Sequence, residues 1–291
     1  MKHIMISGAT GYIGISLIRE LVKEYQVYAL VRKESDLSVL NTLIDKECII
    51  QINDDNVYKT IRQAQPEYYI NLMGRFIAEH SEDNLAELLE GNFDVPVRLL
   101  DAVCQAGCKK IINTGTYWQN FNGENNNPVD LYGAVKNAFE NIIKYYTETL
   151  GCRCITLKLF DTYGPNDKRK KLLTVLAEMK DGESIDLSDC MQKVYYCHIK
   201  DVVSAYIATM GLLDEAKSGY MEGYAVRDEK PVVLKDIIMK LTKIANKDIN
   251  LNFGMRKNRK REIANPEGIG KTIPGWECTV SLEQGLKELL G

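Results

Sequence analysis

The chain lacks any apolar run long enough to cross a membrane. A membrane-spanning helix needs about 18 to 20 apolar residues in succession, and no stretch of the 291 residues approaches that length. Residues Met1–Gly8 show no charged segment followed by a long apolar one, as a secretory signal would, and enter a strand pattern directly. We therefore expect a cytoplasmic protein with no membrane partner.

The chain also lacks a strong excess of charge. Lys and Arg number 37 and Asp and Glu 40, so the formal net charge is only −3. This balance argues against a protein that binds nucleic acid through a basic face. The hydrophobic fraction of 45% and charged fraction of 26% are typical of globular proteins, and the length suffices for two lobes with substantial cores.

Histidine is scarce, which bears on the interpretation of the eight cysteines. Only three histidines occur, and none lies beside the close pairs Cys104/Cys108 and Cys152/Cys154. Their spacings are those of residues on one helix face and of alternate residues in a strand, as in buried packing. We interpret the cysteines as reduced thiols and expect no metal site.

Short apolar runs alternate with helical patterns along the first half of the chain. The runs are His3–Ser7, Gln26–Val31, Glu47–Ile52, Tyr68–Leu72, Lys110–Thr114 and Arg153–Leu159. This alternation predicts an α/β fold with a doubly wound parallel sheet, the Rossmann fold. We assign residues 1–165 to this domain, with a return segment at 193–215, and residues 166–291 to a smaller C-terminal lobe.

Three glycines follow the first strand and open the first helix. They stand in Gly8-Ala9-Thr10-Gly11-Tyr12-Ile13-Gly14, one residue longer at the front than the common dinucleotide fingerprint. In this context, glycines permit a tight turn and a close approach to a pyrophosphate, which then faces the helix N-terminus. The sequence therefore predicts a dinucleotide site, with an ordinary glycine-rich turn as the alternative.

The end of the second strand carries basic residues where an acidic residue is diagnostic. Asp or Glu there hydrogen-bonds the ribose 2′-hydroxyl of NAD, whereas Arg accommodates the 2′-phosphate of NADP. The chain has Arg32 and Lys33 at this point. NADP(H) is therefore favoured, with NAD(H) as the alternative cofactor and a merely solvated strand end as the alternative interpretation.

Tyr132 and Lys136 stand four residues apart on a helical pattern, and hence on one helix face. A tyrosine pKa is about 10, and a nearby ammonium is expected to lower it toward the range of efficient acid–base catalysis. The spacing gains weight from Thr116, which ends the preceding strand at the same sheet edge. Its hydroxyl can bind the substrate oxygen that Tyr132 protonates.

Together these features resemble the extended short-chain dehydrogenase/reductase family, the NAD-dependent epimerases and dehydratases, over essentially the whole chain. Residues 113–119, 160–165 and 273–276 are similar to its nucleotide-sugar 4-ketoreductases, notably the CDP-sugar branch with the abequose and paratose synthases. The resemblance implies a nucleotide-linked 4-keto-6-deoxy or 3,6-dideoxy hexose as substrate, with a CDP-sugar favoured, and a substrate-binding role for the C-terminal lobe.

The resemblance also implies roles for single residues. Tyr132 would be the acid/base, Lys136 would bind the nicotinamide ribose, and Thr116 would be the catalytic hydroxyl. The cofactor would contact Gly8, Thr10, Gly11, Tyr12, Ile13, Gly14, Arg32, Asp54, Met73 and Gly74. The nucleotide-sugar would contact Trp118, Asp161, Arg169, Lys171 and Arg259.

Some of these residues have a second interpretation. The basic runs Lys168–Lys171 and Arg256–Arg261 are either solvated surface or patches that bind phosphate-bearing ligands beside the crevice. Trp118 either fills the core or lies against the sugar, and its place two residues after Thr116 favours the sugar.

The leading functional hypothesis is an NADPH-dependent 4-ketoreductase. Its nearest rival is an epimerase of the same fold, and a non-catalytic NADP-binding regulator is a rival of another class. A dehydratase is disfavoured, because Tyr117 and Trp118 follow Thr116 where that reaction needs an acidic residue. In the resembled family, helices matching Leu85–Ala106 and Leu131–Leu150 often form a dimer interface, so we expect a homodimer; burial within one chain is the alternative.

Overall fold

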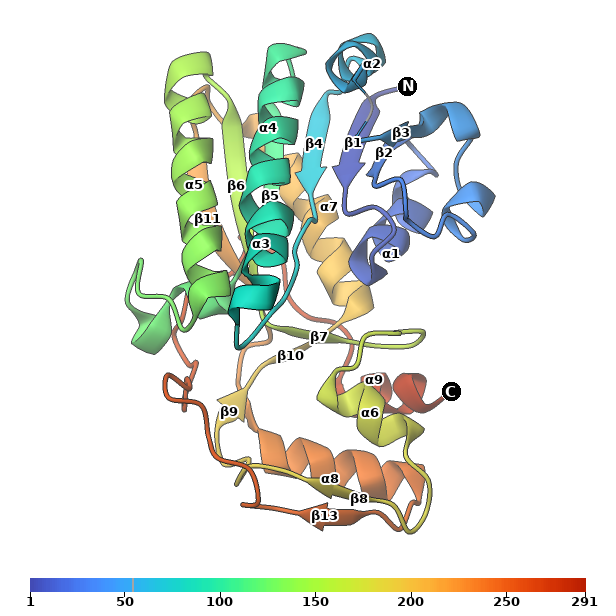
Figure 1. Cartoon of the computed structure of the whole chain (residues 1–291), viewed down its shortest axis with the longest axis vertical. Helices are drawn as coiled ribbons and strands as arrows, with labels where there is room; N and C mark the ends of the chain where they lie inside the picture. Colours follow the sequence, from blue (N-terminus) through green and yellow to red (C-terminus); the bar gives the residue numbers. More distant parts are fainter. Residues whose placement is uncertain (54) are drawn as a thin grey trace.

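A seven-stranded sheet forms the centre of the protein, and the computed structural model describes residues 1–53 and 55–291. The strand order is β3-β2-β1-β4-β5-β6-β11 (Figure 1), and each neighbouring pair is parallel. The strands are β1 His3–Ser7, β2 Gln26–Val31, β3 Ile49–Gln51, β4 Tyr68–Asn71, β5 Lys110–Thr116, β6 Arg153–Leu159 and β11 Met221–Val226. The predicted doubly wound α/β fold is thus confirmed. Asp54, expected to contact the cofactor, lies outside the described residues.

Helices cover both faces of the sheet because successive strand residues point in opposite directions. In β1, Ile4 and Ile6 belong to the core under α1 and α7, whereas Met5 belongs to the core under α2, α4 and α5. These helices are α1 Tyr12–Leu21, α7 Ile199–Glu215, α2 Val57–Ala64, α4 Val95–Gln105 and α5 Leu131–Leu150. Short 3₁₀ turns lie at Leu40–Thr42, Lys46–Cys48, Tyr117–Gln119 and Phe121–Gly123.

The predicted single helical stretch Leu85–Ala106 is wrong in detail. The chain forms α3 (Glu82–Leu89), a π-helical turn (Glu90–Asp94) and then α4. Within the turn, the buried Asn92 amide donates to the carbonyl oxygens of Leu88 and Arg75, both at 2.8 Å. A π turn inserts one residue into a helix and is frequent at functional sites.

The smaller lobe lies beyond the carboxyl ends of the central strands (Figure 1). It contains α6 Leu172–Glu178, α8 Leu234–Ala245, α9 Leu282–Leu290, and the strand pairs β8 Ser184–Asp186 with β13 Asn250–Asn252 and β9 Lys193–Val194 with β12 Val232–Val233. The pair β7 Asp161–Tyr163 and β10 Tyr196–His198 lies at the junction. β11, which lies outside the expected return segment 193–215, pairs with β6 in the central sheet.

Two further observations concern the cysteines and the length of the helices. The eight cysteines are free thiols, and seven of them are buried. Within the described ranges, no helix combines the length and the apolar character of a membrane span.

Candidate active site

The glycine turn between β1 and α1 brings backbone against backbone. Gly8 has φ +70°, and a Cβ there would stand 2.7 Å from the carbonyl carbon of Leu72. A Cβ at Gly14 would stand 2.5 Å from the Gly8 oxygen. The first turn of α1 carries no acidic side chain, and the free amide groups of a helix N-terminus suit a pyrophosphate. The residues present fit a dinucleotide.

Tyr132 and Lys136 lie on the first turns of α5, which Asp130 caps by accepting the Gly133 amide at 2.8 Å. The Lys136 ammonium donates to the carbonyl oxygens of Met73 (2.7 Å) and Thr114 (3.1 Å). It is thereby held at the carboxyl ends of β4 and β5, the edge where ligands bind in such sheets.

Gly74 lies where both reactive groups meet. The Tyr132 Oη atom is 3.7 Å and the Lys136 Nζ atom 3.5 Å from the point that a Cβ of Gly74 would occupy. The predicted residues Tyr132, Lys136, Met73 and Gly74 are therefore brought together.

Burial controls the electrostatics of this pair. It lowers the pKa of Lys136 to about 8, with Glu140 acting in the opposite direction. Burial also raises the pKa of Tyr132, and the charge of Asp130 raises it further. In the protein alone, loss of water and the charge of Asp130 therefore shift the tyrosine pKa upward, opposite to the lowering expected from Lys136.

Thr116 ends β5 with its hydroxyl near the start of a 3₁₀ turn. The oxygen accepts the Trp118 amide at 3.3 Å, which leaves the hydroxyl hydrogen available for another acceptor. The Thr116 amide donates to the Gln119 side chain at 2.8 Å. Buried Gln119 in turn donates to Asn137 (2.7 Å) and Glu140 (2.6 Å), so it ties the strand end to α5.

Two residues near this pair were missed by sequence reasoning. Asn92 accepts the Arg75 amide at 3.1 Å and donates to the Arg75 oxygen, which fixes the loop after β4. That loop carries Phe76, whose ring centroid lies 5.1 Å from that of Trp118 and 5.4 Å from that of Tyr132. Gly91 beside Asn92, within a helical pattern, was the available signal for the first; no pattern marked the second.

A cleft of about 460 Å³ opens beside these aromatic rings. Its lining includes four predicted substrate residues, namely Trp118, Asp161, Lys171 and Arg259. Both basic runs contribute to it, and the charged side chains that line it are Lys170, Lys171, Arg256, Lys257, Arg259 and Arg261 against Glu79, Asp161, Asp186 and Glu262. Part of each basic run therefore lies on the cleft wall, which suits a phosphate-bearing ligand.

Two cations of the cleft lie on aromatic faces. The Arg259 guanidinium lies 4.5 Å from the ring centroid of Trp118. The Lys171 ammonium lies 4.7 Å from that of Phe76. Trp118 thus contacts the cleft rather than serving only as core.

Arg169 does not line the cleft with its neighbours. Its guanidinium pairs with buried Asp167 at 2.7 Å, donates to the Thr162 oxygen at 3.0 Å, and lies 4.7 Å from the Tyr12 ring centroid. The Tyr12 hydroxyl donates to the Pro165 oxygen at 3.1 Å. The structure therefore places Arg169 against the glycine turn and away from the expected substrate position.

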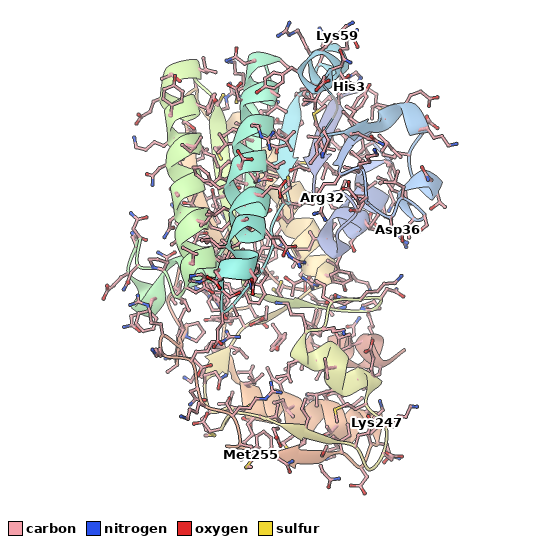
Figure 2. All side chains as sticks on the ribbon, in the orientation of Figure 1. His3, Arg32, Asp36, Lys59, Lys247 and Met255 are labelled. Carbon is pink, nitrogen blue, oxygen red and sulfur yellow. The ribbon has the colours of Figure 1, made fainter. Side chains whose placement is uncertain are left out.

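Arg32 is exposed directly after β2, as expected for a residue at the adenosine end of a dinucleotide site. Figure 2 shows it in the sheet domain near Asp36, with Lys247 and Met255 in the smaller lobe. The half-buried Thr10 and Ile13 belong to the glycine turn and the start of α1.

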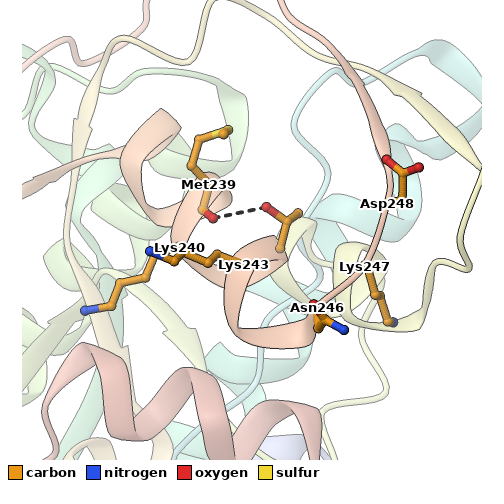
Figure 3. Close-up of a pocket in the computed structure, with 7 residues that line it drawn as sticks. Met239, Lys240, Lys243, Asn246, Lys247 and Asp248 are labelled. Carbon is orange, nitrogen blue, oxygen red and sulfur yellow. Dashed lines mark hydrogen bonds between the residues drawn. The ribbon is translucent and has the colours of Figure 1, made fainter.

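A second hollow, of about 720 Å³, lies on α8 and the residues after it (Figure 3). It is lined by Met239, Lys240, Thr242, Lys243, Asn246, Lys247 and Asp248. Although larger, it shares no lining residue with the cleft and holds none of the predicted site residues. The chemistry therefore points to the cleft.

The fold and this site define a dinucleotide-dependent enzyme class with a Tyr/Lys pair at the sheet edge. Residues 4–221 match the model of the NAD dependent epimerase/dehydratase family, and the chain belongs to that family. The resemblance stated from the sequence is thus confirmed.

Two curated relatives and one solved structure are similar over most of their length. A CDP-abequose synthase of Salmonella muenchen is 28% identical, over 99% of this chain and 97% of the relative. A CDP-abequose synthase of Yersinia pseudotuberculosis is 25% identical, over 91% and 92%. The structure of a Thermus thermophilus UDP-glucose 4-epimerase complex with NAD is 17% identical and has a TM-score of 0.80, over 99% and 97%. The last shows the fold alone.

Proposed function

We propose that the protein is an NADPH-dependent reductase of a nucleotide-linked 4-keto-6-deoxy or 3,6-dideoxy hexose, with a CDP-sugar favoured. The observation that carries this proposal is the meeting of Tyr132 and Lys136 at Gly74, beside a cleft walled by aromatic rings and cations. The likeness to CDP-abequose synthases over nearly the whole chain supports the substrate class.

Each site residue has a defined task in this reaction. Gly8, Gly11 and Gly14 form the cradle for the pyrophosphate of the dinucleotide, which supplies a hydride to the carbonyl carbon when bound. Tyr132 donates its proton to the oxygen as negative charge develops there. The Thr116 hydroxyl, whose oxygen already accepts the Trp118 amide, donates a hydrogen bond to the same substrate oxygen and keeps its own proton.

Lys136 holds the reactive end of the site together. Its ammonium joins the ends of β4 and β5 to α5 and presents its positive charge near the phenol. As Tyr132 loses its proton, that charge stabilises the phenolate that forms.

The cleft cations bind the anionic part of the substrate in this proposal. Arg259 and Lys171 rest on aromatic rings and can turn toward a diphosphate, for which arginine offers a bidentate geometry. The exposed Arg32 binds the 2′-phosphate of NADPH, and NAD remains the cofactor of the solved relative named above.

The proposal is tested by measuring the absorbance of NADPH during reaction with CDP-4-keto-6-deoxyglucose. We expect one NADPH to be oxidised for each sugar reduced. Tyr132→Phe should lower the rate by roughly 10² to 10⁴-fold, while NADPH still binds. An epimerase would convert the sugar without net NADPH consumption, and a regulator would bind NADPH without turnover of any sugar nucleotide. Turnover by Tyr132→Phe at the wild-type rate would reject the assigned acid.

We also propose a homodimer that uses the outer surface of α3 and α5. Leu85, Leu89 and Tyr145 are large apolar side chains exposed on these helices. Large apolar side chains exposed on these helices are available to an interface of this kind. A dimer mass by sedimentation at micromolar concentration is the expected result, and a monomer would reject it.

A further inference from the structure

Phe76 is an apolar ring exposed in a cleft whose rim is charged. It is 44% exposed, and it lines the cleft together with Trp118. Its edge-to-face contacts reach Trp118 on one side and Tyr132 on the other, at 5.1 and 5.4 Å between centroids. Phe76 is therefore the cleft residue in ring contact with the proposed acid, and it extends the surface of Trp118 up to that acid.

The backbone beside Phe76, in the loop after β4, is held in place by a residue of the π-helical turn. Asn92 binds both the amide and the carbonyl of Arg75, and its Oδ1 atom lies 3.6 Å from the Cβ position of Gly74. A ring on a fixed backbone presents a wall of defined position. Such a wall can discriminate between ligands by shape and polarity.

The aromatic carbons of this wall offer no hydrogen-bonding groups, which determines the ligands that it favours. A sugar hydroxyl pressed against aromatic carbon loses its hydrogen bond to water and gains no partner, which is unfavourable. A methyl or methylene group at the same place gains from burial. The proposed function places C4 at Tyr132, so the carbons next to C4 come within reach of the Phe76 ring, which contacts Tyr132.

We propose that Phe76, together with Trp118, selects a hexose that is deoxygenated at C6, and that the rings contact the methyl group carried by C5, the carbon next to the reacting carbonyl. The inference rests on the proposed function, since that function places the carbonyl at Tyr132. Phe76 is a specificity-determining residue in this view, and it takes no part in proton transfer.

The test uses binding to the NADPH-loaded enzyme. CDP-glucose and CDP-6-deoxyglucose both carry a hydroxyl at C4, so neither is reduced by NADPH. The wild type is expected to bind the 6-deoxy sugar on the order of 10 to 100-fold more tightly, the range for one added hydroxyl or methylene in an apolar pocket. Phe76→Asn should bring the ratio of the two dissociation constants near one, whereas Phe76→Leu should keep most of the preference.

A matched control separates this effect from general damage. Phe253 also lies under a lysine, with the Lys235 ammonium 4.6 Å from its ring centroid, but it does not line the cleft. Phe253→Asn should therefore keep the wild-type ratio. CDP without a sugar should still bind every variant, because in the Phe76 variants only the ring under Lys171 changes. A wild type without preference, a ratio unchanged in Phe76→Asn, or loss of CDP binding by that variant would each overturn the inference.

The binding and turnover measurements test the role of Phe76 and the proposed reaction separately. A wild type that prefers the 6-deoxy sugar but oxidises no NADPH with the 4-keto sugar would reject the proposed reaction and keep the role of Phe76. An active reductase without that preference would reject the role of Phe76 alone.

Discussion

The Lys136 ammonium lies 5.9 Å from the ring centroid of Tyr132, buried behind the phenol that it is expected to assist. Its donors are directed to the carbonyl oxygens of Met73 and Thr114. The protein thus keeps a positive charge in a place that water does not reach. This burial determines how the stability of the fold depends on pH.

Lys136 should make the protein less stable at neutral pH than near pH 10. Its pKa is about 8 in the folded chain against an ordinary value of 10.5. Between these values the unfolded chain binds more protons, so the free energy of unfolding rises with pH across this window. The gain from this group is up to about 3 kcal/mol. Urea denaturation of the wild type and Lys136→Met at both pH values measures it.

The comparison isolates Lys136 because other groups titrate alike in both chains. Lys136→Met should lack the rise, so the difference between the two unfolding free energies should change between neutral pH and pH 10. A constant difference would show that the ammonium is not destabilised by burial.

Gly14→Ala should disrupt the cofactor turn, because the added Cβ would meet the oxygen atoms of Gly8 and Ala9 at 2.5 and 2.7 Å. These are backbone atoms that cannot rotate away. We expect a loss of at least about 10-fold in NADPH affinity with a lower melting temperature, measured by titration and thermal unfolding.

Gly211→Ala is the matched control on α7, where no atom lies within 4 Å of the added Cβ. Alanine in an exposed helix position should stabilise by about 0.5 to 1 kcal/mol relative to glycine. Equal effects of the two substitutions would mean that the close approach at Gly14 is unimportant.

Arg32→Asp should change the cofactor preference from NADPH toward NADH. In the proposed site the substitution removes the cation assigned to the 2′-phosphate, an interaction of roughly 1.5 to 3 kcal/mol, and adds an acceptor for the ribose hydroxyls. The ratio of the two dissociation constants should shift by on the order of 10-fold or more. Lys59→Ala, at the other end of the sheet domain (Figure 2), should leave this ratio unchanged.

Elements bounded by local signals could be predicted from the sequence. The strands His3–Ser7, Gln26–Val31 and Arg153–Leu159 have the expected bounds, as has the helix Leu131–Leu150. Apolar runs that end at polar residues fix such strands, and Asp130 caps the helix. These elements are predictable because the residues that start and end them are neighbours in the sequence.

The features that sequence reasoning missed depend on contacts between distant segments. The π turn forms where Asn92 reaches Arg75, 17 positions earlier in the chain. Within the segment 193–215, the chain forms two short strands, β9 and β10, which are separated at Tyr195, whose buried ring packs edge-on against Phe160 at 5.1 Å. Neither partner can be inferred from the spacing of apolar residues.

The ligands of the charged residues are likewise not predictable from the sequence. From the sequence alone, Arg169 and Arg259 are both predicted to contact the phosphate-bearing substrate. The fold directs the first to buried Asp167 and the second to the face of Trp118 in the cleft. Which cation is free to bind a ligand depends on the carboxylates that the fold brings near it.

Arg169→Met and Arg259→Met should therefore have opposite effects on stability and binding. Loss of Arg169 leaves the Asp167 carboxylate buried without its partner, which should lower the free energy of unfolding by about 1 to 3 kcal/mol. Loss of Arg259 should change stability little, but weaken the binding of CDP by on the order of 10-fold or more, as expected for a charged hydrogen bond to phosphate. Urea denaturation and titration calorimetry of both variants measure the two effects. If Arg169→Met instead weakened CDP binding at unchanged stability, the pairing with Asp167 would not be what holds this arginine.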